Sequence, residues 1–248
     1  MKKNISIRLF CEVTLGVGKK IILEHEQTHY LKNVMRCKVN DRIIIFDNTT
    51  GEYAAEIVNI HKRIINIEVL EKTKPICVPG DIWLIFCPLK KTRTDFLIEK
   101  STELGLRKFL PTISDKTQTK IVSMNRCKKN IVEAVEQCGG TFIPEILPVN
   151  PLAKIIQTLP KDRILVFCDE SLESRNINDC LLKEKPEKVA LLVGPEGGFS
   201  DSERKLFRTK KNVLPVSLGN RILRAETAAV AALTMWHGLV GDWHKRVD

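Results

Sequence analysis

Residues 191–203 read LLVGPEGGFSDSE, an apolar run that ends in a glycine-rich turn and then opens a helix. The run Val189–Val193 predicts a buried strand, since short continuous apolar runs are typical of parallel sheets. The glycines permit positive φ and close approach of the backbone, and Ser200 with Glu203 forms an S-x-x-E capping box. The stretch therefore predicts a strand-to-helix connection of an α/β fold, where a ligand could lie on bare backbone.

The turn alone does not establish a ligand. It matches neither the G-x-G-x-x-G dinucleotide fingerprint nor the G-x-x-x-x-G-K-[ST] phosphate loop, and no lysine follows the last glycine. A tight connection without any ligand stays open as the alternative at this point, because short glycine-containing connections are common.

The chain of 248 residues is 43% hydrophobic, which excludes a disordered protein and suits one large domain or two smaller ones. Lys and Arg number 40 against 30 Asp and Glu, so the net charge is +10. The excess is spread over several clusters and favours a folded basic face for structured RNA or DNA, with a merely solvated basic surface as the alternative. Because only 6% of the residues are aromatic, recognition of backbone and shape is expected rather than stacking on bases.

The eight cysteines never form a C-x-x-C pair, and several lie in apolar runs. They predict buried, reduced thiols in a cytosolic chain rather than disulfides. No apolar run approaches the ~20 residues that a membrane span needs. The five histidines lack the spacing of metal ligands, so no metal site is expected.

Strand signals with short connections predict a small β-barrel over residues 1–72. Its expected elements are the strands Ile5–Phe10, Asp41–Phe46, Tyr53–Ile60 and Ile64–Leu70, and a helical stretch near Thr28–Arg36. The residues DNTTG at 47–51 predict a hairpin turn between two of these strands. Residues 73–80 contain two prolines and a glycine and predict a linker.

Residues 81–248 alternate between strands and helices, which predicts a mostly parallel sheet with helices on its faces. The expected strands are Ile82–Phe86, Lys108–Pro111, Ile164–Phe167, Val189–Val193 and Val213–Val216, and the expected helices are Thr94–Leu104 and Asn130–Cys138. Ligands of such sheets lie beyond the carboxyl ends of the strands, where Gly194–Gly198 would be.

A second informative stretch follows the last expected strand. Residues 218–233 read LGNRILRAETAAVAAL, a Gly-Asn turn followed by two arginines and an alanine-rich helix. Alanines on several faces let a helix pack closely, so this helix is expected to be buried or at an interface. An ordinary core helix is the alternative.

Taken together, GPEGGFS and the downstream L-G-x-R-I-L-R-x-E-T-A resemble the RsmE family of 16S ribosomal RNA (uracil-N3) methyltransferases, within the SPOUT superfamily. The resemblance extends to Glu99–Gly105, Glu133–Gly139, Ile143–Glu145 and, in the first domain, His29–Arg36. It implies a PUA-like RNA-binding barrel, a C-terminal domain tied in a trefoil knot around S-adenosylmethionine, and a homodimer. Gly140, Cys127 and the short segment at 114–126 depart from the family pattern and bear on RNA contacts near residues 126–140.

The resemblance also implies that the backbone of two loops holds the adenine and ribose of the cofactor. The expected cofactor-binding residues are Leu192, Gly194, Pro195, Gly197, Gly198, Leu218, Gly219, Ile222 and Leu223. Glycines are expected there because a Cβ would occupy the volume of the ligand.

Methyl transfer to uracil N3 requires loss of the imide proton, and a cation near the uracil oxygens would stabilise the anion. We hypothesise that Arg224 has this catalytic role, with Arg221 as the alternative, because both lie beside the second loop. A phosphate contact or an ion pair with Glu226 is the competing role for these arginines.

The expected contacts to the RNA backbone are Arg8, Arg36, Lys90, Lys91 and Arg93. Two other functions stay open: a methyltransferase acting on ribose 2′-oxygen, and a non-catalytic RNA-binding assembly factor.

Overall fold

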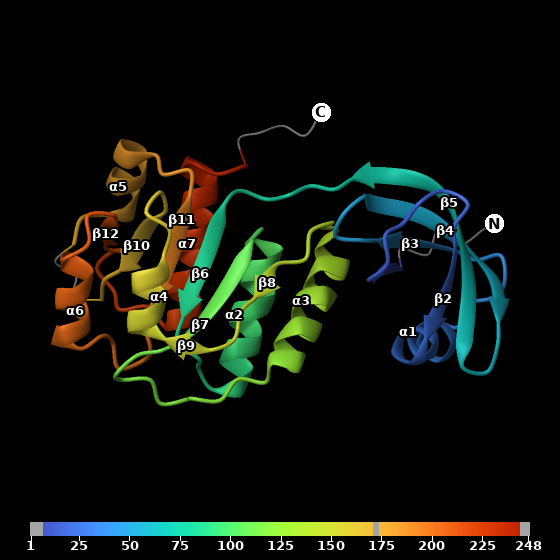
Figure 1. The fold of residues 1–248 in the computed structure, drawn as a ribbon, viewed down its shortest axis with the longest axis horizontal. Coiled ribbons are helices and arrows are strands. Elements are labelled where there is room, and N and C mark those ends of the chain that lie inside the picture. Colours follow the sequence, from blue (N-terminus) through green and yellow to red (C-terminus); the bar gives the residue numbers. More distant parts are fainter. Residues whose placement is uncertain (1–6, 171–173, 244–248) are drawn as a thin grey trace. The chain divides into compact units, whose positions relative to one another are not determined.

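A computed structural model describes residues 7–170 and 174–243 of the chain. The chain divides into two compact units (Figure 1). The first contains the residues up to Val78 together with Val135–Ile143, and the second contains Pro79–Ala134 and the residues from Pro144 onward.

The first unit contains a five-stranded sheet in the order β1-β3-β4-β5-β2. Its strands are β1 (Arg8–Phe10), β2 (Lys20–Glu24), β3 (Arg42–Phe46), β4 (Gly51–Ile60) and β5 (Ile64–Pro75). β1 pairs in parallel with β3, and the other pairs are antiparallel. The predicted strands at 41–46, 53–60 and 64–70 are confirmed, β2 was not predicted, and the beginning of the strand expected at 5–10 lies outside the described residues.

The turn between β3 and β4 is fixed by Asp47. Its carboxylate accepts hydrogen bonds from the backbone N–H groups of Leu15 at 2.6 Å and Thr49 at 2.8 Å. Gly51 ends the turn with φ of +113°, and a Cβ there would lie 2.4 Å from the carbonyl oxygen of Lys74. Only glycine fits this position, which is why the DNTTG stretch forms the predicted turn. The pairing of Gly51 with Pro75 also carries β5 into the stretch that was expected to be a linker.

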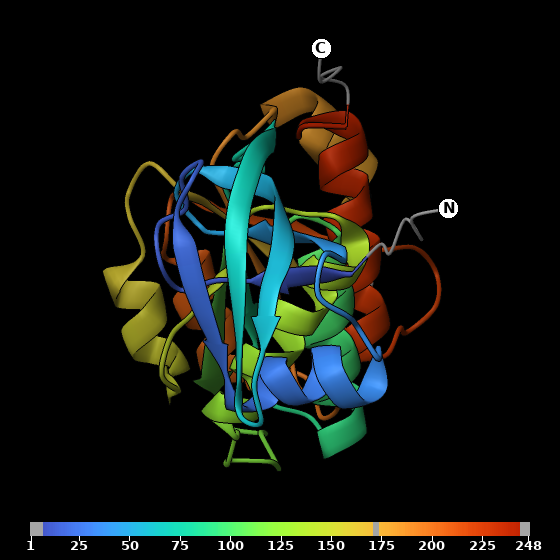
Figure 2. The same cartoon turned by 90° about the vertical axis from the view of Figure 1, so that its right-hand side faces the viewer.

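The helical stretch of the first unit begins three residues earlier than predicted. It consists of α1 (His25–His29) followed by one turn of π-helix, η1 (Tyr30–Val34). The N–H of Met35 donates to the carbonyl of Tyr30 at 2.9 Å, the i to i+5 bond that defines this turn. Figure 2 shows this segment at one end of the strands.

The second unit contains a sheet in the order β12-β10-β11-β6-β7-β8, with β9 paired to β7 and every described pair parallel. Its strands are β6 (Ile82–Phe86), β7 (Lys108–Ile113), β8 (Glu145–Ile146), β9 (Asn150–Pro151), β10 (Ile164–Cys168), β11 (Val189–Val193) and β12 (Val213–Val216). The predicted parallel sheet is confirmed. Every residue of β11 is buried, as its apolar run requires.

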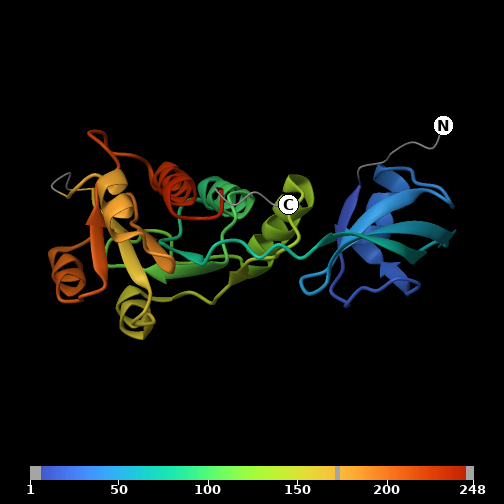
Figure 3. The same ribbon diagram turned by 90° about the horizontal axis from the view of Figure 1, so that it is seen from above.

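Helices cover both faces of this sheet, as Figure 3 shows. The helices that follow β6 in the chain are α2 (Lys91–Glu103), α3 (Met124–Cys138), α4 (Leu152–Thr158), α5 (Ile177–Glu184), α6 (Asp201–Arg208) and α7 (Ala225–Leu239). α2 and α5 pack against α7 on one face. On the other face, the aromatic rings of Phe167, Phe199 and Phe207 pack together beneath α6.

The predicted cap of α6 is confirmed. The Ser200 hydroxyl accepts a hydrogen bond from the N–H of Glu203, and the Glu203 carboxylate accepts one from the N–H of Ser200 at 2.9 Å. Glu203 also accepts from the N–H of Asp115 at 2.9 Å, so the capping box is tied to the loop after β7.

All eight cysteines are free thiols, of which six are buried and Cys77 and Cys138 are exposed. No helix in the described part of the chain is long and apolar enough to cross a membrane.

Candidate cofactor site

Four neighbouring strands of the second unit end at one edge of the sheet. β12, β10, β11 and β6 are adjacent and parallel, so the segments that follow them emerge side by side. These segments begin at Ser217, Asp169, Gly194 and Cys87. This edge is the place at which parallel sheets bind ligands.

The glycines of the turn after β11 are explained by protein neighbours. A Cβ at Gly194 would lie 2.7 Å from the ring of Phe199, and a Cβ at Gly198, which has φ of +67°, would lie 2.1 Å from a carboxylate oxygen of Glu170. At Gly197 the nearest atom would be the Cβ of Lys116 at 3.3 Å. These glycines let Phe199, Glu170 and Lys116 approach the turn. The cofactor contacts expected of their backbone stay a prediction.

Leu192 is the last residue but one of the buried strand β11, which leads into the glycine-rich turn. Its side chain is fully buried in the core with Ile85 and Phe199, and its residue pairs with Phe167 of β10. Pro195 is buried as well. The side chain of Leu192 therefore belongs to the core, and the cofactor contact expected of its backbone stays a prediction.

The pocket at this edge is formed mainly by the second loop. It encloses about 50 Å³ and is lined by Cys168, Asp169, Glu170, Leu218, Gly219, Arg221, Ile222, Leu223 and Ala228. Five of these residues were predicted to be site residues. Gly219 has φ of +104° and no atom within 4 Å of where a Cβ would be, so its backbone is open to a ligand.

Asp169 and Glu170 form the acidic side of the pocket, and sequence reasoning missed them. Both carboxylates pair with the guanidinium of Arg204 from α6. Glu170 also accepts a hydrogen bond from the N–H of Phe199 at 3.1 Å. The turn after β11 therefore helps to position the Glu170 carboxylate in the pocket. The signal available in the sequence was an acidic pair directly after the strand at 164–168, at the same edge as the glycine-rich turn.

Cys168 lines the pocket without being a reactive thiol. Burial raises its pKa to about 12, so the sulfur stays protonated at neutral pH. It contributes a small apolar surface.

The two arginines predicted to be catalytic are both exposed, as is Ile222, whose side chain has 78% of its surface free. Arg221 lines the pocket, whereas Arg224 is the N-cap residue of α7 and is absent from the lining. Arg224 makes no recorded pair with Glu226 among the described residues; Glu226 pairs with Arg93, from Nε to Oε1 at 3.6 Å.

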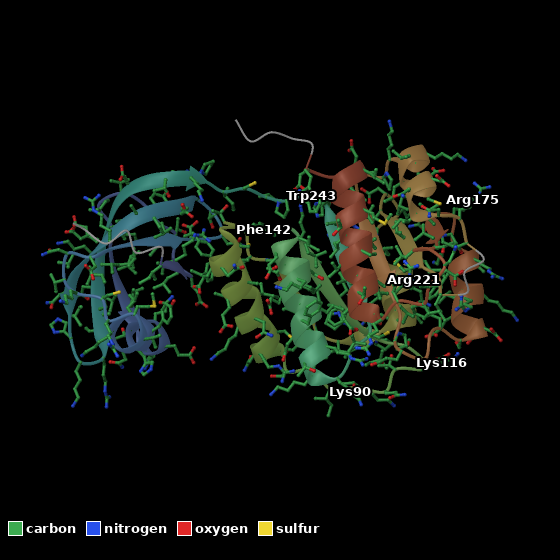
Figure 4. All side chains as sticks on the ribbon, turned by 180° about the vertical axis from the view of Figure 1, so that it is seen from behind. Lys90, Lys116, Phe142, Arg175, Arg221 and Trp243 are labelled. Atoms are coloured by element: carbon green, nitrogen blue, oxygen red, sulfur yellow. The ribbon has the colours of Figure 1, made fainter. Side chains whose placement is uncertain are left out.

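The predicted RNA contacts other than Arg8 differ in how free their side chains are. Arg36, Lys90 and Lys91 are exposed, as such contacts require. Arg93 is held by Glu196 as well as by Glu226, with 3.4 Å between Nη1 and Glu196 Oε1. Figure 4 shows Lys90 and Lys116 near the lower edge of the second unit and Arg221 higher on the same unit.

Arg8 is corrected from an RNA contact to a structural residue. Its guanidinium pairs with Glu52 at 2.7 Å and donates to the carbonyls of Val135, Glu136 and Gly140 at 2.8 to 3.1 Å. These partners occupy its donors, so the side chain fastens residues 135–143 to the sheet of the first unit.

Comparison with known proteins identifies the family. Residues 77–237 match the RNA methyltransferase domain, and residues 23–70 match the RNA methyltransferase PUA domain. Ribosomal RNA small subunit methyltransferase E of Buchnera aphidicola is 36% identical over 98% of this chain and 99% of its own length. The protein of the same name from Rickettsia conorii is 32% identical over 94% of both chains.

The chain belongs to the ribosomal RNA small subunit methyltransferase E family. This is the family that the paired motifs resemble, and its PUA domain corresponds to the β unit predicted at the N-terminus. The methyltransferase E structure from Neisseria gonorrhoeae, which is bound to S-adenosyl methionine, superposes with a TM-score of 0.87 at 27% identity and covers 96% of this chain and 99% of its own. A methyltransferase of Legionella pneumophila in complex with the bound cofactor SAM superposes with a TM-score of 0.86 at 28% identity over the same shares.

The predicted fold class, a mostly parallel α/β sheet with a small N-terminal β domain, is thus confirmed. The trefoil knot that the resemblance implies stays a prediction.

Proposed function

We propose that this member of the methyltransferase E family transfers the methyl group of S-adenosylmethionine to N3 of a uridine in 16S ribosomal RNA. The observation that carries the proposal is the full-length match to methyltransferase E relatives, in a chain whose predicted second loop forms the pocket at the carboxyl edge of the sheet.

The pocket fits the chemistry of this cofactor. Leu218, Ile222 and Leu223 offer apolar surface to a purine ring, and the open backbone at Gly219 allows close approach. Asp169 and Glu170 supply carboxylate oxygens on the other side, which can accept hydrogen bonds from the hydroxyl groups of a ligand, while Arg204 balances their charge. When bound, S-adenosylmethionine supplies an electrophilic methyl group.

The protein's contribution to the reaction is positioning and electrostatics. In this reaction the N3 proton would pass to water, the bond from N3 to the methyl carbon would form as the bond from that carbon to sulfur breaks, and S-adenosylhomocysteine would leave. We propose that Arg224 or Arg221 places its guanidinium near the uracil oxygens and stabilises the negative charge left by the proton. Support comes from their exposure at and beside the pocket, where no fold contact recorded among the described residues occupies either side chain.

We further propose that the enzyme is a cytoplasmic homodimer that acts on 16S rRNA or the small subunit, with Arg36, Lys90 and Lys91 as backbone contacts. The family resemblance supports the dimer. The alanine-rich helix is not an argument for it, because Ala228, Ala229 and Ala232 are buried within one chain.

Deleting the gene and performing reverse transcription across the small-subunit rRNA tests the reaction and locates the product. A methyl group on N3 blocks the Watson–Crick edge and stops the transcriptase. A stop that disappears in the deletion strain and returns when the protein is supplied supports the proposal. A stop pattern that does not depend on the gene contradicts it.

A further inference from the structure

The first unit contains a basic pocket, and its lining includes none of the residues predicted to contact RNA. It encloses about 230 Å³ and is lined by His25, Thr28, His29, Lys32, Asn33, Lys62 and Arg63. Lys32, Lys62 and Arg63 carry a positive charge at neutral pH. The lining contains no carboxylate. We name this pocket the PUA basic pocket.

One wall of the PUA basic pocket is the α1–η1 segment. The change from α-helix to π-helix at Tyr30 lies within this wall, and π turns are frequent at functional sites. The amide of Asn33 is hydrogen-bonded to Nδ1 of His29 at 2.9 Å, across one helical turn. The hydroxyl of Thr28 is already used, since it donates to the carbonyl of Leu23 at 2.7 Å and anchors the segment to β2.

The opposite wall is the turn between β4 and β5. His61 closes the turn by donating its N–H to the carbonyl of Ile64 at 2.9 Å, and Lys62 and Arg63 project from it. Lys32 joins the two walls, because its ammonium donates to the carbonyl of His61 at 3.3 Å. The pocket is therefore held open by hydrogen bonds within the fold, while Lys62 and Arg63 are exposed and have no recorded partner among the described residues.

The chemistry of the lining selects an anion with several acceptor oxygens. Lysine and arginine side chains provide only donors, and a positively charged hollow with converging donors suits a phosphate group. On the proposed function, the polyanion that the protein must hold is RNA. Contacts of this type fix the position of an RNA strand without reading its sequence.

We propose that the PUA basic pocket binds a backbone phosphate of the RNA substrate. This inference rests on the proposed function and deepens it by assigning the first unit a defined contact to the substrate, centred on Lys62 and Arg63.

The test uses the full chain with Lys62→Ala and Arg63→Ala combined. The matched control combines Lys20→Ala with Lys38→Ala, which removes the same charge from exposed positions of the same unit outside the pocket. Affinity for unmethylated 16S rRNA is measured by filter binding over a range of KCl concentrations. Thermal melting and calorimetry with S-adenosylmethionine report on folding and on the cofactor site.

The pocket variant is expected to bind the RNA about tenfold more weakly than the control at physiological salt. Its plot of log K against log salt should be shallower by about 0.7 to 0.9, the slope that one lost phosphate contact removes. Affinity for S-adenosylmethionine should not change. The swap Lys62→Arg with Arg63→Lys keeps both charges and should keep most of the RNA affinity.

Equal RNA affinity and equal salt slope in the pocket variant and the control would overturn the proposal. Failure of the proposed function is seen separately, as a wild-type protein that binds RNA but neither binds S-adenosylmethionine nor methylates.

Discussion

Arg93 pairs with the buried carboxylate of Glu226, with 3.6 Å between Nε and Oε1. The same guanidinium lies 3.4 Å from Glu196, so it joins the start of α2 to the glycine-rich turn and to the first turn of α7. The second oxygen of Glu226 is buried without a hydrogen-bond partner among the described residues. Arg93 is thus the cation that balances a charge held inside the fold beside the cofactor site.

Replacing Arg93 with Ala should destabilise the protein, because the Glu226 carboxylate would remain buried and unpaired. The expected cost is about 1–3 kcal/mol, which corresponds to a fall in melting temperature of roughly 2–12 °C for a protein of this size. Differential scanning calorimetry measures it, with the exposed neighbour Lys91→Ala as the control. An unchanged melting temperature in Arg93→Ala would show that the pair does not support the fold.

Replacing Gly198 with Ala should weaken cofactor binding by tenfold or more. The added Cβ would meet the Glu170 carboxylate at 2.1 Å and would have to adopt a strained positive φ, so Glu170 would be pushed from its place in the pocket. Gly238→Ala is the control, since that glycine is in α7 and no atom lies within 4 Å of the new Cβ. Calorimetry measures the affinity of each variant for S-adenosylmethionine. Equal affinities in Gly198→Ala and Gly238→Ala would show that the position of Glu170 does not affect cofactor binding.

Contacts between residues close in the sequence were predictable, whereas contacts that depend on the order of the strands were not. The capping box of Ser200 and Glu203 and the turn at 47–51 were predictable because their partners lie within a few residues. Glu170 was not, because its place in the pocket depends on β10 lying between β11 and β12. Arg8 was misassigned for the same reason: its partners Val135 and Glu136 are more than 120 residues away in the chain.

Single-turnover kinetics at saturating RNA and S-adenosylmethionine should separate the two candidate catalytic arginines. Loss of a charge-stabilising donor lowers the chemical rate by about 10²–10³, and we expect this for Arg224→Ala or, if Arg221 has the role, for Arg221→Ala. Arg208→Ala, at the exposed end of α6, is the control. Near-normal rates in both variants would exclude guanidinium stabilisation by either residue.

Stability should fall as the pH is lowered below about 6.5, in part through His237. Burial lowers the pKa of its imidazole, although Asp242, 2.7 Å from Nδ1, opposes the shift. Between the lowered folded pKa and the unfolded value of about 6.5, the unfolded chain binds more protons, so acid favours unfolding.

Melting temperatures at pH 7.5 and pH 5.5 measure this effect of His237. The loss on acidification should be smaller in His237→Gln than in the wild type and unchanged in His61→Gln, whose side chain is exposed. A loss of equal size in His237→Gln and the wild type would assign the pH dependence to other groups.

The chemical identity of the methylated nucleoside is the most direct test of the proposed reaction. The purified protein is incubated with unmethylated 16S rRNA and S-adenosylmethionine carrying an isotopic label in its methyl group, and the RNA is digested to nucleosides for mass spectrometry. We expect labelled 3-methyluridine from the wild-type protein, and much less of it from Gly198→Ala when the S-adenosylmethionine concentration is too low to saturate that variant. Label found only in 2′-O-methyluridine, or no labelled nucleoside at all, would contradict the proposed reaction.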